Sequence, residues 1–387
     1  MKAYIAKDLK NLNRRTVYQC IRNSSEQTVS CAQIARETHI SMPTVVKITE
    51  YFVKKGLLLE IGESESNGVG RRPSMLKFNP NAFCSVGVAY NGKDLELSLI
   101  NMNYEAVRSD RIRTSVTIGQ MFSDLSPSAL SAFLSAAGAG GEKIVGIGIA
   151  LPVILDTANY KTDYPAPLIG IDSSYDFKAE CDKISGYFNC PLYMENDVNA
   201  AALGEFKERG MTEKHDLIYI TLGSGIGSGI ILNGRLRRGE NYAAGEIGYM
   251  TFDESYHVGK RSIGYLESCL SADFLQKKFG YNVYGDNHEN DAETKIRVAD
   301  QIATYLSLCI LNMSSILDIS NFVVGGFVVE QMKDLILKFT KEKIDNNGLN
   351  KINVLPEISS FPTSKGMGSI VIDKTLDNIL MDGGMDE

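Results

Sequence analysis

The apolar positions near the start of the chain recur at the spacing of α-helices, in three short segments. Residues 13–24 place three apolar side chains on one helical face: Val17, Cys20 and Ile21. Residues 29–41 form the second segment, in which Ser30 is a candidate N-cap ahead of an apolar stripe. The third segment, residues 42–55, follows after a short turn. The pattern therefore predicts three short helices in succession.

The third predicted helix, 42–55, has clear start and stop signals. Ser41 can cap it, and Pro43 lies in its first turn, where the missing N–H costs no hydrogen bond. Gly56 is expected to end it. Its buried side is expected at four apolar positions: Val46, Ile48, Phe52 and Val53.

Two short runs after this helix have the composition of β-strands. They are "LLLEI" (57–61) and "SMLKF" (74–78), and they flank the polar, glycine-bearing stretch "GESESNGVGRRP". Three helices followed by a β-hairpin is the plan of a winged helix-turn-helix domain, which we predict for residues 1–80. The helix at 42–55 would then lie in the major groove of DNA.

From about residue 84 the pattern changes to strands that alternate with helices. "CSVGVAY" and "ELSLINM" are predicted to form a hairpin, and residues 143–151 are a continuous apolar run of the kind found in buried strands. Residues 216–223 and 321–328 have the same character. Since strand-then-glycine patterns recur through the segment, we predict an α/β domain over residues 81–387, with two related halves around a cleft.

Charge is distributed unevenly along this chain of net charge −7. Residues 1–80 contain 13 lysines and arginines against 7 acidic residues, a net charge of +6, which leaves −13 for the remainder. A basic head on an acidic body favours contact with a polyanion, the alternative being a chance fluctuation. Seven scattered cysteines without a CxxC pair indicate reduced thiols and a cytoplasmic protein. The N-terminal residues are not those expected of a signal peptide, and no apolar run is long enough to predict a membrane-spanning helix.

The predicted head offers candidate DNA contacts at two places. Ser41, Thr44 and Lys47 lie on the early turns of the helix at 42–55, where they can reach base edges or phosphates. Arg71 and Arg72 lie in the predicted wing, where they can enter a narrow minor groove. The alternative is a helical protein-interaction module with solvated charges.

Three constellations in the body could bind a ligand. In "YMENDVNAAALGEF", Asp197 could accept a proton from a hydroxyl group and Asn196 could bind one, although both could also be plain helix-capping residues. The alternating glycines of "GSGIGSG" (223–229) could bind phosphate or form a turn without a ligand. Glu246 and Glu267 could hold vicinal hydroxyls, or they could be solvent-exposed glutamates.

Together these stretches resemble the ROK family of repressors, open reading frames and kinases. The resemblance rests on "ENDVNAAALGE" and "GSGIGSGIILNGRLRRGENYAAGEIGY", and "GRRPSMLKFNP" is similar to the repressor branch typified by xylose and N-acetylglucosamine repressors. It implies a two-lobed, actin-like ATPase body of the sugar-kinase and ribonuclease H-like type. In the kinases the residue matching Asp197 is the catalytic base, and those matching Asn196, Glu246 and Glu267 hold sugar hydroxyls. The glycine loop would face the ATP phosphates.

The chain departs from the kinase pattern at the turn after its first body strand. The family has a D-x-G-G-T turn there, whereas this chain has Ala89 in place of the Asp, Asn91 in place of a Gly and Lys93 in place of the Thr. Since phosphoryl transfer depends on positioning and on electrostatic stabilisation of a charged transition state, ATP chemistry should fail. Lys93 could still attract an anion, so these substitutions do not exclude nucleotide binding.

Two further departures concern a zinc site and the sugar pocket. Tyr249 replaces the family's zinc-binding His, and Val258, Lys260 and Tyr265 stand where its cysteines belong. His257 and Cys269 are too few for a tetrahedral site, so we predict no structural metal, with the loop held by packing through Tyr249 and Tyr265. The family's P-G-P turn becomes Pro152-Val153-Ile154, which changes the shape expected for the pocket.

The sequence therefore predicts a sugar-responsive DNA-binding regulator, a repressor of carbohydrate-uptake or catabolic genes, without enzyme activity or cofactor. Its expected partners are double-stranded DNA, a small sugar effector and a second copy of itself, with a tetramer as the alternative. Two other interpretations remain at this stage. One is a sugar kinase with an attached DNA-binding head, and the other is a DNA-binding protein whose pocket is vestigial or answers to a phosphosugar.

Overall fold

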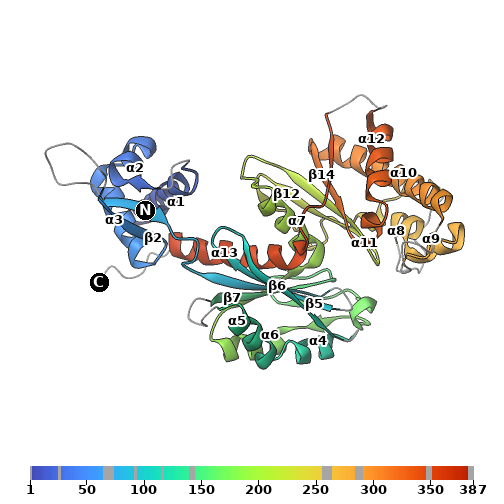
Figure 1. The fold of residues 1–387 in the computed structure, drawn as a ribbon, viewed down its shortest axis with the longest axis horizontal. Coiled ribbons are helices and arrows are strands. Elements are labelled where there is room, and N and C mark those ends of the chain that lie inside the picture. The colour runs from blue at the N-terminus through green and yellow to red at the C-terminus, as the bar shows by residue number, and fades with distance from the viewer. Residues whose placement is uncertain are drawn as a thin grey trace.

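The N-terminal part of this computed structural model contains three helices and a small sheet (Figure 1). The structure describes residues 2–24, 28–63, 74–90, 94–114, 117–138, 144–254, 264–283, 291–345 and 351–381. The helices are α1 (Lys2–Arg22), α2 (Cys31–Thr38) and α3 (Met42–Lys54). The strands β1 (Val29–Ser30), β2 (Leu58–Glu63) and β3 (Ser74–Phe78) form an antiparallel sheet in the order β1-β3-β2. The predicted order of three helices and two hairpin strands is confirmed.

Of the N-caps and buried positions predicted for these helices, some are confirmed and others are not. The Ser30 hydroxyl accepts a hydrogen bond from the backbone N–H of Gln33 at 3.2 Å, as expected of an N-cap. Ser41 makes no such bond, because its hydroxyl pairs with the Thr44 hydroxyl at 2.8 Å. The predicted buried face of α3 differs from the observed one by one residue at its start, because Val45 and not Val46 is fully buried.

The first lobe is built on a five-stranded mixed sheet in the order β10-β7-β4-β5-β6. Its strands are β4 (Cys84–Tyr90), β5 (Asp94–Asn101), β6 (Ala106–Arg113), β7 (Ile144–Leu151) and β10 (Leu192–Asn196). β4 and β5 pair antiparallel as predicted, and β7 is parallel to both β4 and β10. One shared apolar core joins the sheet to α4 (Ile118–Asp124), α5 (Pro127–Ala136) and α6 (Lys178–Phe188). Short elements between β7 and α6 are β8 (Lys161–Thr162), η2 (Pro167–Ile169) and β9 (Tyr175–Asp176).

The second lobe has a five-stranded sheet in the order β13-β12-β11-β14-β15. Its strands are β11 (Leu217–Leu222), β12 (Ile226–Leu232), β13 (Arg235–Leu236), β14 (Asn321–Gly325) and β15 (Asn353–Pro356). Its other elements are η3 (Ile247–Tyr249), α8 (Tyr265–Leu270), α9 (Ala272–Phe279), α10 (Ala292–Leu317), α11 (Phe327–Glu330) and α12 (Lys333–Asp345). The strand predicted at 321–328 is too long. It ends at Gly325 because Gly326 takes a left-handed φ of +94°, after which α11 begins.

Two helices cross between the lobes, α7 (Asp197–Glu208) and α13 (Pro362–Met381). Their backbones touch: a Cβ added to Gly366 would lie 1.7 Å from the Ala200 carbonyl oxygen, and one added to Gly204 would lie 2.0 Å from that of Pro362. α13 then runs on to the N-terminal part (Figure 1), whose apolar core includes its residues Ile372, Leu376 and Leu380. α13 therefore contacts both the body and the head.

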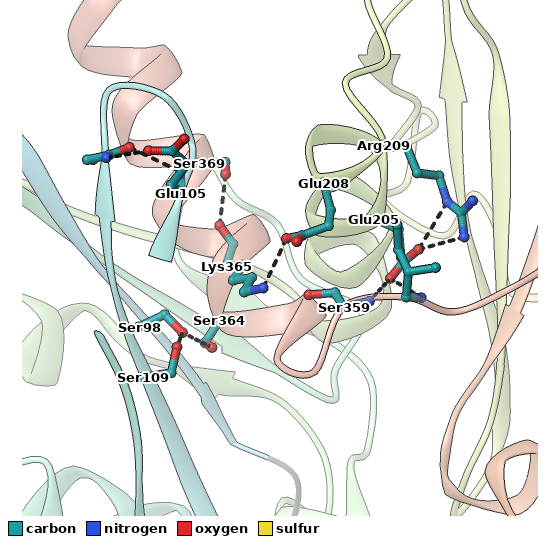
Figure 2. A network of polar contacts seen from close by, with 12 residues as sticks. Ser98, Glu105, Ser109, Glu205, Glu208, Arg209, Ser359, Ser364, Lys365 and Ser369 are labelled. Atoms are coloured by element: carbon teal, nitrogen blue, oxygen red, sulfur yellow. Dashed lines mark hydrogen bonds and ion pairs between the residues drawn. The ribbon is translucent and has the colours of Figure 1, made fainter. Parts of the chain in front are cut away.

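Polar contacts hold α13 in this position (Figure 2). Lys365 forms an ion pair of 2.9 Å with Glu208 of α7, and the Ser364 hydroxyl lies 2.7 Å from that of Ser98 on β5. At the start of the crossing, the fully buried Glu205 accepts a hydrogen bond from the Ser359 backbone N–H at 2.6 Å and pairs with Arg209 at 3.1 Å. None of the helices described is long and apolar enough to cross a membrane.

Candidate functional site

The candidate site begins at the corner between β10 and α7. Asn196 is the N-cap of α7, since its Oδ1 accepts from the backbone N–H of Asn199 at 3.0 Å. Its Nδ2 donates to the Val153 carbonyl oxygen at 3.0 Å, so the helix-cap interpretation is confirmed for this residue. A cap of this kind leaves one amide hydrogen and one lone pair of Asn196 for a ligand.

Asp197 begins α7 directly after this cap. Burial raises the pKa of its carboxyl group to about 6, and hydrogen bonds from backbone N–H groups, Val198 among them, oppose that rise. A carboxyl group with a pKa close to neutrality is suited to exchange a proton or a hydrogen bond with a hydroxyl group.

Glu246 and Glu267 lie near this aspartate. The pKa of Glu246 is raised to about 7, mainly by burial and in addition by the negative charges of Asp197 and Glu267. Burial also raises the pKa of Glu267, which α8 places against the glycine loop, so that a Cβ on Gly225 would lie 2.7 Å from its Oε1. The structure thus brings the Asp197 carboxyl group close to two others that lie 49 and 70 positions further along the chain.

The glycines of the loop at 223–229 each have a neighbour that leaves little room for a side chain. A Cβ on Gly229 would lie 2.4 Å from that of Ala202, and one on Gly227 would lie 3.2 Å from Val198, both on α7. A Cβ on Gly223 would lie 3.3 Å from the ring of Phe327. Close packing of α7, α8 and α11 against the β11–β12 hairpin therefore gives these glycines a structural role of their own.

An ion pair that sequence reasoning missed lies beside the site. Glu195, only 2% exposed, binds Arg238 through its Oε2, at 2.6 Å from Nη2 and 2.7 Å from Nε. Its Oε1 accepts from the Asn196 backbone N–H at 3.1 Å and from Asn199 Nδ2 at 3.2 Å. Glu195 stands within the quoted "ENDVN" motif, but its partner lies 43 positions away, so no local pattern could identify the pair.

Three aromatic rings pack together around Tyr265. The rings of Phe252, Tyr265 and Tyr305 have centroid separations of 6.3 to 6.4 Å, so Tyr265 packs as predicted. Tyr249, for which the same was expected, is 54% exposed, so its packing in the loop stays a prediction. Within the described ranges no group of three or more His, Cys, Asp or Glu residues could hold a metal ion. His257, Val258 and Lys260 lie outside those ranges.

The other predicted positions belong to the turn after β4 and to the predicted DNA contacts of the N-terminal part. Ala89 is buried at the end of β4, 3% exposed, whereas Asn91 and Lys93 lie outside the described residues. Ser41 and Lys47 are exposed on the first turns of α3, and Thr44 is half-buried beside them. Arg71 and Arg72 of the predicted wing also lie outside the described residues.

Comparison with known proteins gives the chain its relatives. A xylose repressor of Bacillus subtilis is 27% identical over 96% of this chain and 98% of that protein. The crystal structure of a ROK family transcriptional regulator, a homolog of the E. coli MLC protein, superposes with a TM-score of 0.76 at 18% identity, over 97% of this chain and all of that one. A ROK family glucokinase from Streptomyces griseus, with glucose and AMPPNP bound, gives a TM-score of 0.56 at 21% identity over 74% of this chain and 98% of that one.

The two structural likenesses show the fold, which is the mixed α/β, actin-like fold of ROK-type sugar kinases. The sequence pattern of the ROK family matches residues 85–356, more than half of the chain. This match covers both lobes and every residue of the candidate site, and the chain belongs to the ROK family.

Proposed function

We propose that this protein is a sugar-responsive transcriptional repressor. The observation that carries the proposal is the likeness to a xylose repressor, which extends over 96% of this chain and so includes the basic N-terminal part as well as the body. In this interpretation residues 1–80 form the DNA-binding domain and residues 81–387 form the sugar-sensing domain.

The N-terminal part has the features that a winged helix-turn-helix needs. α2 and α3 share an apolar core with a three-stranded sheet, and the first turns of α3 carry Ser41, Thr44 and Lys47. A helix presented in this way can enter the major groove and place these side chains near base edges and phosphates. Arg71 and Arg72 remain predicted minor-groove contacts. A homodimer would place two such helices on a palindromic operator.

The body supplies a binding site for sugar hydroxyls. Asp197, Glu246 and Glu267 offer acceptor oxygens from three different elements, and Asn196 adds an amide beside them. Carboxylates that share one site repel one another, so a ligand that donates several hydroxyl hydrogen bonds would relieve this repulsion. Because α7 carries part of the site and packs against α13, sugar binding there can bias the arrangement of the body and the head.

The kinase interpretation has less support. Ala89 offers no carboxylate at the place where the kinases position metal-bound phosphates. We therefore infer that the protein is not an enzyme and that it uses its kinase-like site as a sensor.

The experiment that tests the proposal measures DNA binding by fluorescence anisotropy. The protein is added to DNA fragments from around its own gene, in the absence of sugar and in the presence of xylose, glucose, N-acetylglucosamine or one of their phosphates. We expect specific binding that one of these sugars releases. Glu246→Gln should remove the sugar response and keep DNA binding, whereas the same change at the exposed Glu240 should leave both intact. Release of ADP from ATP and a sugar would instead support the kinase.

A further inference from the structure

The segment between β13 and η3, residues 237–246, belongs to the second lobe but contacts the first lobe at two points. Arg238 pairs with Glu195 at the end of β10, with both Nη2 and Nε within 2.7 Å of the same carboxylate oxygen. Further along, the Tyr242 hydroxyl lies close enough to Asp156, which follows β7, for each group to shift the pKa of the other. We call residues 237–246 the strap.

The strap is joined firmly to the second lobe at both ends. At its start the Arg237 backbone N–H donates to the Ile230 carbonyl oxygen of β12 at 2.8 Å. Near its end the Gly245 carbonyl oxygen accepts from both the backbone N–H and the hydroxyl of Ser228, each at 2.9 Å. Gly245 has a φ of +95° and leaves no room for a Cβ, which would lie 2.0 Å from the Ser228 carbonyl oxygen. The position of the next residue, Glu246, is therefore tied to β12.

The Glu195 carboxylate ties the other side of the site to the strap. One of its oxygens binds Arg238, and the other accepts the backbone N–H of Asn196 and the side-chain amide of Asn199. Glu195 is 2% exposed, so Arg238 supplies the opposite charge that an ionised carboxylate needs when it is buried. One side chain thus links the corner that carries Asn196 and Asp197 with the strap that leads to Glu246.

We propose that Arg238 is a positioning residue of the sugar site. Its pairing with Glu195 sets the separation between the Asn196–Asp197 corner on the first lobe and Glu246 on the second. Its Nη2 and Nε are both directed to Glu195, so the role proposed for Arg238 is exerted through that carboxylate. The inference rests on the proposed sugar-sensing function and adds a residue through which the two lobes hold the ligand.

Arg238→Gln should separate the two sides of the site. The Glu195 carboxylate would be left buried without a cation, so it would take up a proton or turn away, and its contacts to the α7 corner would weaken. The matched control is Arg237→Gln, which removes the same charge from the adjacent, exposed position on the strap. Any difference between the two variants therefore reports the pairing with Glu195 and not the net charge of the strap.

The test measures sugar binding by titration calorimetry on the full-length protein, with xylose, glucose and N-acetylglucosamine as probes. We expect the wild-type protein and Arg237→Gln to bind the same sugar with Kd values within about twofold of each other. Arg238→Gln should bind this sugar at least roughly tenfold more weakly, because the charged, two-point contact between residue 238 and Glu195 is lost. Arg238→Lys, which keeps the charge, should recover part of the loss.

Equal sugar affinity in Arg238→Gln and Arg237→Gln would overturn the inference. Hydrogen exchange gives a second readout that needs no sugar: amides of residues 195–200 and 243–247 should exchange faster in Arg238→Gln than in Arg237→Gln, and those of α10 should not. Equal exchange in these segments would also overturn it. A wild-type protein that binds none of the probes would count against the proposed function, while the exchange experiment would still decide the role of Arg238.

Discussion

Gly366→Ala tests whether the crossing of α7 and α13 holds the molecule together. The added methyl group would lie 1.7 Å from the Ala200 carbonyl oxygen and 2.7 Å from the Gly204 backbone nitrogen. Both neighbours are backbone atoms, so no flexible side chain can move aside. To reach a separation of 3.0 Å, the shortest that such contacts tolerate, the helices would have to part by 1.3 Å.

We expect Gly366→Ala to lower the free energy of unfolding, because inserting a methyl group where none fits costs about 1 to 3 kcal/mol. The higher helix propensity of alanine would offset about 1 kcal/mol of this cost. The matched control is Gly186→Ala, because Gly186 also lies inside a helix, α6, and nothing is within 4 Å of its added Cβ. That change should raise the free energy of unfolding by roughly 0.5 to 1 kcal/mol.

Urea unfolding followed by circular dichroism compares the two variants, and operator affinity is measured beside it. Affinity should fall in Gly366→Ala, because the far end of α13 contributes to the apolar core of the head, and the Tyr51 hydroxyl donates to the Ile379 carbonyl oxygen at 2.9 Å. If Gly366→Ala stabilised the protein as much as Gly186→Ala does, the argument from backbone contact would be refuted.

Three further predictions concern single side chains. The pKa of Asp197 in the folded protein, about 6, lies above its ordinary value of 3.8, so the folded protein loses stability as the pH rises from 3.8 to about 6. Asp197→Asn removes this cost and should therefore raise the urea midpoint of unfolding at pH 8 but not at pH 4. Lys47→Ala should lower operator affinity and reduce its salt slope by about one, whereas Lys54→Ala at the other end of α3 should change neither. Tyr51→Phe should cost roughly 0.5 to 1.5 kcal/mol in urea unfolding by removing the bond to Ile379, and an unchanged midpoint would show that the bond contributes nothing.

The sequence by itself determined the order of elements and the identity of the family. The three helices and hairpin of the head, the buried strand β7 and the Ser30 cap follow from spacing and hydrogen bonding between residues close in the chain. The family motifs also pointed to Asp197, Glu246 and Glu267, which the structure brings close to one another. Such local signals carry this information because helical periodicity and capping depend on neighbours within about four residues.

Tertiary structure alone decided the contacts between distant segments. It buried Val45 in place of Val46, ended β14 at Gly325 and assigned packing roles to the loop glycines. It also paired Glu195 with Arg238 and carried α13 from the lobes into the core of the head. These outcomes depend on which surfaces meet when the chain folds, because burial, close packing and ion pairing are properties of neighbours in space.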